Sequence, residues 1–389
     1  MDVLAIFRSD WERAREIHGE NYTGEDIFYW KPLEEKPIIT IAFLICIVLS
    51  MLVGFVGNIL VIGAVCVHRR LRTTGNVFIV NLAIADLVVV SIVLPYNIVG
   101  IVIGPEHFLN FEAICHAVAT ICVSSCACSM MTLAAIALNR YIFVCRNKYY
   151  HRMYNKCTTP IMCVFLWLLV LCIDMPSYLG WGGHAYDFQT MGCSFDRKGH
   201  LSYVLFLSVA IYWVPFILVF ICYILIYKYV QKNRKQLRKA FSRISCNNAA
   251  VLNTRREEEI RMVRTFFIVV VVFLICWTPY DLLVLFDRKD DAPRILYVIL
   301  LTIGHSNSAL NSILYASTNR RFRRGYLQFI SLITNSQCFR KGGLDSHAFN
   351  STKNGLPAYL KNSSDDNSGT SLGTQQTGKS QPSPRPFKR

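Results

Sequence analysis

The chain has 389 residues, of which 53% are hydrophobic and only 17% are charged. A soluble protein of this size usually buries less apolar surface, so the composition favours a protein embedded in lipid. The net charge of +16 is compatible with nucleic-acid binding. However, Lys and Arg collect in alternate loops beside long apolar runs, as they do on the cytoplasmic side of membrane proteins. We therefore expect a lipid-bilayer protein with no nucleic-acid partner.

Seven apolar runs follow one another along the chain. Three of them contain no Asp, Glu, Lys or Arg, namely residues 38–67, 113–139 and 201–227. Each exceeds the roughly 20 residues that a helix needs to cross the hydrocarbon layer. The other predicted spans are residues 76–104, 157–179, 265–286 and 295–318. The pattern predicts an all-α integral membrane protein, a seven-transmembrane helix bundle over residues 38–318.

The charges of the connecting segments predict the orientation of the bundle. Basic residues gather in segments 68–72, 146–156, 228–264 and 320–324, which we expect to be cytoplasmic. The tail of residues 1–37 has more acids than bases and is predicted to be extracellular. Residues 332–389 are mostly small and polar and predict a disordered cytoplasmic tail. We expect a multi-pass protein of the plasma membrane.

Nearly all of the fifteen cysteines fall inside spans or cytoplasmic segments, where disulfides are not expected. Only Cys115 and Cys193 are placed for an extracellular bond. Asn21 opens an Asn-Tyr-Thr sequence in the outer tail and is a predicted glycosylation site. Cys338, beyond the last span, is either palmitoylated or a free cytoplasmic thiol.

Asp86 lies in the middle of the second span, where an ionised group is costly unless it faces the bundle interior. A carboxylate among neutral oxygens can hold a sodium ion or a proton. The alternative is a structural hydrogen-bond network that joins the helices. Oxygen partners from other spans are Asn58, Ser129, Asn307, Ser308 and Asn311.

Prolines interrupt three spans, at Pro176, Pro215 and Pro279. Each removes a backbone hydrogen bond and bends its helix. Trp277 lies just before Pro279, an arrangement suited to a helix that swings when a ligand pushes on the Trp side chain. The simpler interpretation is that Trp277 only packs.

The triplet Asn139-Arg140-Tyr141 ends the third span at its predicted cytoplasmic side. Arg140 can reach water or bond to a neighbouring helix. Glu259, at the inner end of the sixth span, would approach Arg140 if those helices pack together, and the pair would form a latch that activation breaks. Two independent, solvated charges are the alternative.

Together, these residues resemble rhodopsin-like G protein-coupled receptors from about residue 38 to residue 329. The resemblance implies a heterotrimeric G protein as partner, a receptor kinase and arrestin at the tail, and an amphipathic eighth helix over residues 319–331. No cofactor is expected apart from a sodium ion at Asp86. The motif residues that carry the resemblance are Asn58, Asp86, Cys115, Arg140, Trp167, Tyr223, Phe273, Trp277, Pro279, Asn311, Tyr315 and Phe322.

Two departures from the commonest pattern bring the chain closer to melatonin receptors, which it also resembles around residues 75–88 and 186–195. Asn139 replaces an acidic residue and Ser312 replaces a proline. Both changes are expected to loosen the resting state and raise basal activity. The polar residues with which melatonin receptors hold their ligand do not carry over, because the matching positions are Ser177, Ala185 and Ile211.

The cavity between the outer helix ends is the predicted ligand site. Cys122 occupies the position where amine receptors, by resemblance, have an acid, so a monoamine is not expected. Aromatic residues crowd these helix ends, and we predict a small, largely apolar ligand. The predicted pocket residues are Cys122, Ser177, Arg197, Ile211, Trp277, Tyr280 and Asp281.

Other functions fit the sequence less well. A resemblance to the medium-chain fatty-acid receptor branch makes Arg197 a carboxylate anchor; the alternative is a surface charge that the neighbouring Asp196 neutralises. A transporter should show inverted repeats, and the sequence has none. An enzyme should place a nucleophile and a base, or a set of metal ligands, at membrane depth. His116 and His305 are single and unaccompanied, and both are interpreted as packing or hydrogen-bonding residues.

Overall fold

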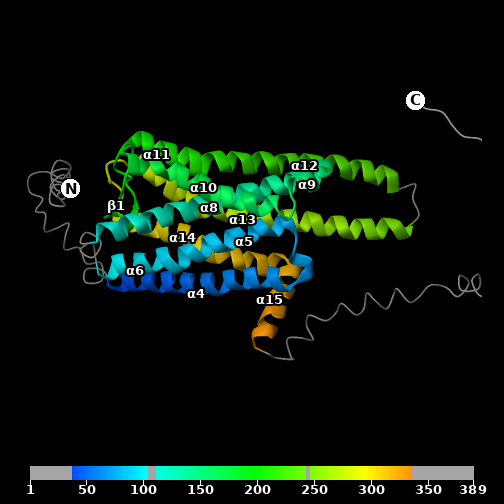
Figure 1. Cartoon of the computed structure of the whole chain (residues 1–389), viewed down its shortest axis with the longest axis horizontal. Helices are drawn as coiled ribbons and strands as arrows, with labels where there is room; N and C mark the ends of the chain where they lie inside the picture. The colour runs from blue at the N-terminus through cyan, green and yellow to red at the C-terminus, as the bar shows by residue number, and fades with distance from the viewer. Residues whose placement is uncertain (1–36, 104–110, 242–245, 335–389) are drawn as a thin grey trace, which may run out of the picture. The chain divides into compact units, whose positions relative to one another are not determined.

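The computed structural model describes residues 37–103, 111–241 and 246–334, apart from the side chains of residues 233–241 and 246–262. All of these residues belong to one structural unit, Met1–Gly343. Its long helices run side by side, with β1 and α11 at one end of the bundle and α9 at the other (Figure 1). The helices that form the spans are α4 (Pro37–Val67), α5 (Thr74–Val88) with α6 (Leu94–Val102), α8 (Glu112–Cys145), α10 (Thr158–Asp174), α11 (Leu201–Leu207) with α12 (Val214–Phe241), α13 (Cys246–Phe286) and α14 (Arg294–Thr318).

Large apolar side chains cover the outside of the bundle. Leu52, Ile161 and Ile275 are 60%, 66% and 66% exposed, respectively. Such a surface suits lipid and is unsuited to water. Six stretches in the described part of the chain are long and apolar enough to cross a membrane, and they include every predicted span but the last.

The last span, α14, is less apolar because it carries polar residues that face the bundle. It packs along α13 and α4, and buries these side chains against them. Its length of 25 residues is sufficient to cross the hydrocarbon layer. The seventh span is therefore stabilised by its neighbours more than by contact with lipid. Its buried polar residues are His305, Asn307, Ser308, Asn311 and Ser312.

Two spans change their helical pitch ahead of a proline. A π-helical turn over Val89–Val93 joins α5 to α6 and precedes Pro95. A second one over Ser208–Trp213 joins α11 to α12 and precedes Pro215. Proline has no N–H for the regular hydrogen-bond ladder, and a wider turn accommodates the missing bond. Pro176 lies in the tighter turn Met175–Leu179 that ends the fourth span.

The eighth helix, α15 (Arg320–Ile333), leaves the bundle at an angle (Figure 1) and coincides with most of the segment 319–331 in which an eighth helix is expected. Asn319 caps its first turn by accepting a hydrogen bond from the backbone of Arg321. A Cβ atom at Gly63 of α4 would lie 2.4 Å from the Phe329 ring, so only glycine lets α15 approach this closely.

Short elements close the two ends of the bundle. β1 (His184–Asp187) and β2 (Gly192–Phe195) form an antiparallel hairpin between α10 and α11, with Tyr186 opposite Cys193. At the other end, α9 (Asn147–Met153) follows α8 and buries Tyr150 against it. The hairpin and α9 therefore lie at the outer and inner ends of the predicted topology.

Candidate functional site

A cavity of about 130 Å³ lies between α8, the π-helical turn before α12, α13 and α14, and β2 closes one side of it. Its walls are mainly apolar or aromatic, with a few polar groups among them, as in most small-molecule sites. Trp277 and Tyr280 contribute aromatic surface, and Ser194 and Phe195 come from β2. Further lining residues are Cys122, Cys126, Val204, Leu207, Ser208, Ile211, Tyr212, Phe273, Asp281, Leu301 and His305.

Two of the predicted pocket residues, Ser177 and Arg197, are not among the lining residues. The Ser177 hydroxyl is turned away, because it donates a hydrogen bond to the Asp174 carbonyl oxygen at 2.7 Å and lies 3.4 Å from Nδ1 of His184. The resemblance placed Ser177 by its position on the chain, but the turn that follows α10 rotates it into this buried contact. The other predicted pocket residues do share the cavity.

Asp281 has the partner that a carboxylate at this depth requires. The Ser208 hydroxyl lies 2.9 and 3.0 Å from its two oxygens, and Nε1 of Trp213 donates to one of them at 3.1 Å. These partners come from the π-helical turn over Ser208–Trp213, and no sequence pattern predicts how that turn aligns with α13. The arrangement holds the carboxylate at the cavity wall.

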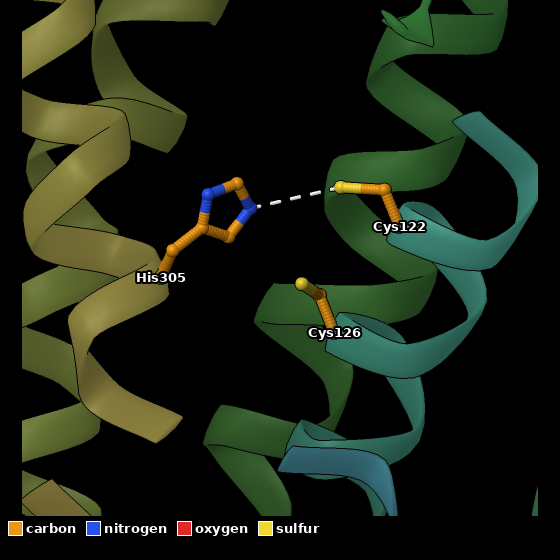
Figure 2. Close-up of side chains that lie close together, drawn as sticks. All are labelled: Cys122, Cys126 and His305. Atoms are coloured by element: carbon orange, nitrogen blue, oxygen red, sulfur yellow. Dashed lines mark hydrogen bonds between the residues drawn. The ribbon is translucent and has the colours of Figure 1, made fainter. Parts of the chain in front are cut away.

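His305 is single in the sequence but not in space. Its Nε2 atom lies 3.6 Å from Sγ of Cys122, and Cys126 points toward the same space from the next turn of α8 (Figure 2). The ring of His305 also packs edge-on against Trp277, with centroids 5.6 Å apart. His305 is therefore not unaccompanied, because two thiols lie beside it. These neighbours come from a distant part of the chain, so the sequence alone does not place them next to His305.

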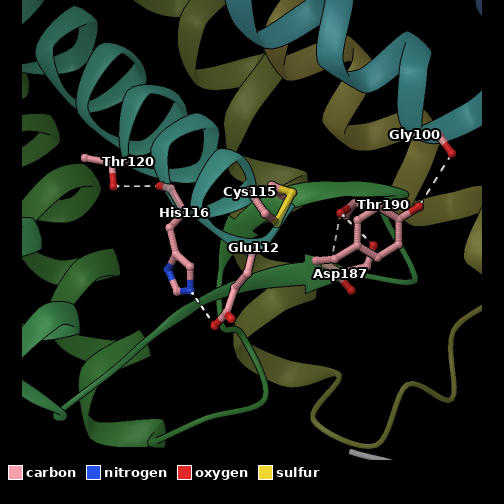
Figure 3. Close-up of a disulfide and its surroundings, with 9 residues drawn as sticks. Gly100, Glu112, Cys115, His116, Thr120, Asp187 and Thr190 are labelled. Carbon is pink, nitrogen blue, oxygen red and sulfur yellow. Dashed lines mark hydrogen bonds and ion pairs between the residues drawn. A yellow bond between two sulfur atoms is a disulfide. The ribbon is translucent and has the colours of Figure 1, made fainter. Parts of the chain in front are cut away.

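The outer hairpin is fastened to the bundle by a disulfide between Cys115 of α8 and Cys193 of β2, which confirms the predicted pairing (Figure 3). The Tyr186 hydroxyl adds a hydrogen bond of 3.5 Å to the carbonyl oxygen of Gly100 in α6. Because β2 also lines the cavity, the disulfide fixes part of the cavity wall.

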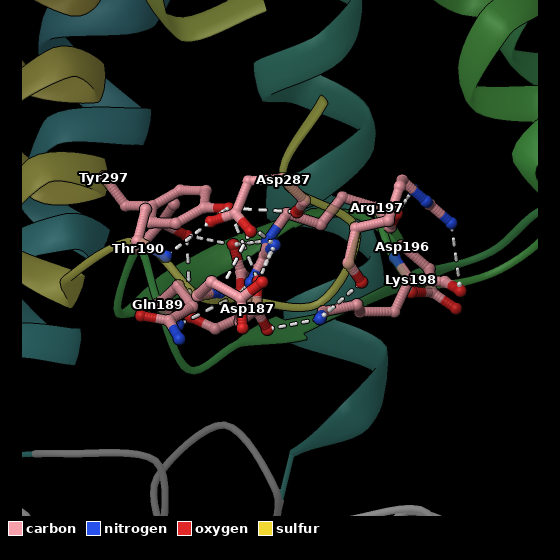
Figure 4. Close-up of polar contacts among 12 residues, drawn as sticks. Asp187, Gln189, Thr190, Asp196, Arg197, Lys198, Asp287 and Tyr297 are labelled. Atoms are coloured by element: carbon pink, nitrogen blue, oxygen red, sulfur yellow. Dashed lines mark hydrogen bonds and ion pairs between the residues drawn. The ribbon is translucent and has the colours of Figure 1, made fainter. Parts of the chain in front are cut away.

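Arg197 follows β2 and is held by acidic residues of the chain itself (Figure 4). It donates to both oxygens of Asp187 at 2.9 and 3.1 Å, and it also pairs with Asp290. Its guanidinium lies 4.5 Å from the centroid of the Tyr297 ring, and the side chain is only 5% exposed. The neighbouring Asp196 instead accepts hydrogen bonds from the backbone N–H groups of Lys198 and Gly199. Arg197 is therefore neither an open carboxylate anchor nor a surface charge neutralised by Asp196.

These contacts keep the outer network ionised. Burial alone would lower the pKa of Arg197, but the charges of Asp187 and Asp290 raise it above its ordinary value. Burial alone would likewise raise the pKa of Asp290, yet hydrogen bonds from Arg197 and Lys198 lower it. Lys198 contributes an ion pair of 2.6 Å to the same carboxylate. The network thus ties the hairpin to the segment between α13 and α14.

The polar cluster predicted around Asp86 is assembled in the core of the bundle. Asp86 is fully buried, and its oxygens accept hydrogen bonds from Asn311 at 2.8 Å and from Ser129 at 3.5 Å. Asn58 is not bound to Asp86, because its amide donates to the carbonyl oxygens of Gly54 and Ser308. The Oδ1 atoms of Asn307 and Asn311 are buried with no hydrogen-bond partner among the residues that the structure describes.

Arg140 lies at the inner end of α8, against the sixth span. Its guanidinium is 4.8 Å from the centroid of the Phe266 ring of α13, a cation–π contact. The amide of Asn139 reaches the Tyr150 hydroxyl of α9 at 3.5 Å, and Tyr141 beside it is half-buried. The predicted partner Glu259 lies in α13, but its side chain is outside the described residues. One contact across this interface is therefore aromatic.

An inner cavity of about 680 Å³ opens beside Arg140, between α8, α9, α13 and α15. Deeper in the bundle, the hydroxyls of Tyr223 and Tyr315 are buried and make no hydrogen bond within the described ranges. The two rings pack against Phe267 and Phe266, respectively, so both contact the sixth span. The inner residues of the predicted switch therefore surround α13. Residues that line the inner cavity include Arg140, Phe143, Tyr150, His151, Phe266 and Arg321.

Membrane-spanning helices with an outer cavity and an inner cavity, joined by α13, define the class of seven-helix membrane receptors. A family model described as the 7 transmembrane receptor (rhodopsin family) matches residues 57–315. The chain belongs to this family. The predicted seven-transmembrane bundle is thereby confirmed, and the protein is a multi-pass membrane protein of a family of receptors. Asn21 and Cys338 lie outside the described residues.

Curated relatives point to one branch of the family. Melatonin receptor type 1B of Homo sapiens is 32% identical over 309 residues, which cover 78% of this chain and 82% of that receptor. Melatonin receptor type 1A of Phodopus sungorus is 32% identical over 307 residues, covering 77% of this chain and 83% of the relative. Squid rhodopsin shares the fold, with a TM-score of 0.65 at 21% identity, over 82% of this chain and 93% of that one. The resemblance to rhodopsin-like and melatonin receptors is confirmed.

Proposed function

We propose that the chain is a G protein-coupled receptor that converts binding of a small, largely apolar molecule in the outer cavity into activation of a heterotrimeric G protein. The observation that carries this proposal is the position of Trp277. It lines the cavity and belongs to α13, which also carries Phe266 against Arg140 at the inner end. A ligand that displaces Trp277 therefore acts on the same helix that restrains Arg140.

The proposed mechanism is a shift between two arrangements of the bundle. Pro279 interrupts the hydrogen bonding of α13 just beyond Trp277, so the helix can pivot there. Outward movement of its inner end separates Phe266 from Arg140 and widens the inner cavity for the G protein. The unpartnered hydroxyls of Tyr223 and Tyr315 are then available to Arg140 or to the G protein.

The ligand is proposed to be small because the volume of the cavity is only about 130 Å³. Typical ligand sites have volumes of roughly 300–1,000 Å³. The relatives are named for melatonin, but the positions that match their polar ligand-binding residues differ here. Ile211 is an apolar part of the cavity wall, and the Ser177 hydroxyl donates to the Asp174 carbonyl oxygen outside the cavity lining. We therefore propose an apolar ligand whose few polar groups meet Asp281 and Ser208. Arg197 is already engaged by Asp187 and Asp290, which argues against the carboxylate-anchor alternative.

Asp86 is proposed to hold a sodium ion that stabilises the resting arrangement. A carboxylate, the Ser129 hydroxyl and the buried carbonyl oxygens of Asn307 and Asn311 are the hard oxygen donors that such an ion prefers. When bound, the ion would neutralise the buried charge. We also propose that the N-terminus is extracellular, and that a receptor kinase and arrestin act on the cytoplasmic tail, residues 332–389.

Nucleotide exchange by a purified G protein, with the receptor in lipid nanodiscs, tests the coupling. Indoleamines, medium-chain fatty acids and small neutral lipids are screened as ligands. Arg140→Ala should abolish stimulated exchange by any active compound while leaving its affinity within about twofold, because Arg140 lies far from the outer cavity lining. Exposed Arg152→Ala on α9 is the matched control. Undiminished exchange by the Arg140 variant would refute the assignment.

A further inference from the structure

Cys122, Cys126 and His305 bring three soft metal ligands to one wall of the outer cavity (Figure 2). The cysteines lie on successive turns of α8, which places both thiols on the same face of the helix. His305 reaches them from α14 on the opposite side. Their ligand atoms all lie within 4.8 Å of one another. Neither the family's sequence motifs nor the proposed switch accounts for this grouping.

We propose that Cys122, Cys126 and His305 form a binding site for Zn²⁺, with the fourth position open to the cavity. Zinc bonds of about 2.3 Å to sulfur and 2.0–2.1 Å to nitrogen, at a tetrahedral angle, place the two ligand atoms about 3.6 Å apart. Sγ of Cys122 and Nε2 of His305 are separated by 3.6 Å. Small side-chain rotations bring Cys126 to the same distance.

Charge and surroundings also fit a zinc ion. Each thiol loses its proton on binding, so two thiolates balance the two charges of Zn²⁺ and leave little net charge within the membrane. The cavity is otherwise mostly apolar, which strengthens bonds to a metal by excluding water. Three protein ligands and an open position are the usual arrangement where zinc also meets a water molecule or a bound ligand.

Asn97 of α6 supplies the outer contact that metal-bound histidines usually have. Its amide lies 3.3 Å from Nδ1 of His305, on the side of the ring that faces away from the thiols. With its carbonyl oxygen turned to Nδ1–H, Asn97 would leave Nε2 unprotonated and aimed at the metal. Asn97 is therefore a positioning residue of the proposed site.

An ion here would link α8 to α14 beside Trp277, whose ring contacts His305. Its occupancy would then change ligand binding and coupling, a consequence that rests on the proposed receptor function. Binding of the ion itself does not depend on any G protein. The two ideas therefore fail in different experiments.

The test is a calorimetric titration with Zn²⁺ of the metal-free receptor in nanodiscs, with the Cys115–Cys193 disulfide intact. Loss of an outer contact typically costs about 10- to 100-fold in affinity. We expect Cys122→Ser and Cys126→Ser to weaken binding by about 100-fold or more, and Asn97→Ala by about tenfold. The controls Cys163→Ser, a buried thiol of α10, and His116→Ala, at the outer end of α8, should retain it.

Titration with Cd²⁺ provides a second readout, because cadmium–thiolate bonds absorb in the ultraviolet. Cys126→His keeps a ligand in place, so it should retain zinc binding within about tenfold while reducing the cadmium–thiolate absorbance. This variant decides the matter if the serine variants fold poorly. The proposal is overturned if the intact receptor has no zinc site, if Cys163→Ser weakens binding as much as Cys122→Ser, or if Cys126→His loses it entirely.

Discussion

Gly304 lies directly against the indole of Trp277. A Cβ atom at this position would be 3.1 Å from the ring, which is closer than side chains normally pack. Glycine is needed here for close approach, since the backbone of α14 is helical. The resting position of Trp277 therefore depends on the absence of a methyl group on a neighbouring helix.

Gly304→Ala should raise basal nucleotide exchange. The added methyl destabilises the resting position of Trp277 by about 1 kcal/mol, which corresponds to about a fivefold shift toward the active arrangement. Nucleotide exchange in the absence of added ligand measures this shift. Gly183→Ala is the control, because a Cβ atom there meets Asp196 at an ordinary 3.6 Å. Unchanged basal exchange in a normally folded Gly304 variant would argue against Trp277 as the switch.

At the scale of elements, α4 and α14 are in closest contact where Gly57 faces Ser312. A Cβ atom at Gly57 would lie 2.0 Å from Oγ and 2.7 Å from Cβ of Ser312. The Ser312 hydroxyl is turned back to the carbonyl oxygen of Ala309 at 2.9 Å. Close helix contact through small residues is the main source of packing between helices in lipid.

Gly57→Ala should lower thermal stability, because overpacking of this kind costs about 1–3 kcal/mol. The double variant Gly57→Ala with Ser312→Gly removes the opposing atoms and should recover most of the loss. Thermal unfolding of the receptor in detergent, followed by thiol reactivity of buried cysteines, measures both. Equal melting temperatures for the single variant and the native chain would contradict the contact.

The outer network joins two other elements, the β1–β2 hairpin and the segment between α13 and α14. Asp290 has a positive φ of 57°, which Asn tolerates as well as Asp. Asp290→Asn should therefore keep the turn but weaken the pairing with Arg197 and Lys198. Charge-assisted hydrogen bonds contribute about 1.5–3 kcal/mol, so hydrogen exchange in β1 and β2 should become about tenfold faster or more. Unaltered exchange would show that the disulfide alone holds the hairpin.

The same network predicts a pH dependence. The folded-state pKa of Asp290 is lowered, so its contribution to stability is present above the ordinary value of about 4 and is lost as the pH falls through the lower, folded-state value. The protection factors of the hairpin amides, which correct the exchange rate for its intrinsic pH dependence, should therefore stay constant throughout the neutral range and fall only in strong acid. A fall in these protection factors between about pH 5 and 7, where histidine titrates, would point to a different group.

For the whole molecule, the balance between resting and active states depends on how firmly Arg140 is held. A receptor with an acidic residue at position 139 would have a charge-assisted partner for this arginine, whereas Asn139 offers a neutral amide that is directed to Tyr150. Phe266 supplies a cation–π contact of about 0.5–2 kcal/mol. Position 139 thus contributes no ion pair to the restraint of Arg140 in the resting state.

Asn139→Asp should consequently lower basal nucleotide exchange by about three- to tenfold, because an added ion pair of about 1 kcal/mol favours the resting state. Asn147→Asp, exposed at the start of α9 and outside the lining of the inner cavity, is the matched control for the added charge. Exchange is measured at equal receptor density in the absence of ligand. A rise in basal exchange in Asn139→Asp would mean that Asn139 restrains the active state instead.

Much of the fold could be predicted from the sequence because lipid restricts the choices. Uninterrupted apolar runs allow little other than spanning helices, and the positions of Cys115 and Cys193 sufficed to predict the disulfide. Asp86 and its partner Asn311 were also identified, because a buried carboxylate requires hydrogen-bonding neighbours. These predictions depend on local composition or on a strong energetic penalty.

The missed features depend on how distant helices rotate against one another. The grouping of His305 with Cys122 and the pairing of Asp281 with Ser208 join residues far apart in sequence, with no periodic signal between them. Arg197 was placed beside Asp196 by adjacency, whereas its partners are Asp187 and Asp290. Rotation of a helix by one residue changes such neighbours without changing the apolar pattern.

The polar face of α14 also bears on how the protein is made. A helix inserts from the translocation channel into the bilayer according to the transfer free energy of its side chains. Because α14 buries Asn307 and Asn311 within the bundle and packs on α4 and α13, these earlier spans favour its insertion. The last span therefore completes the bundle by assembly with earlier spans. A variant that displaces α4 would leave α14 without its partner, and the incompletely assembled receptor would be retained and degraded in the endoplasmic reticulum.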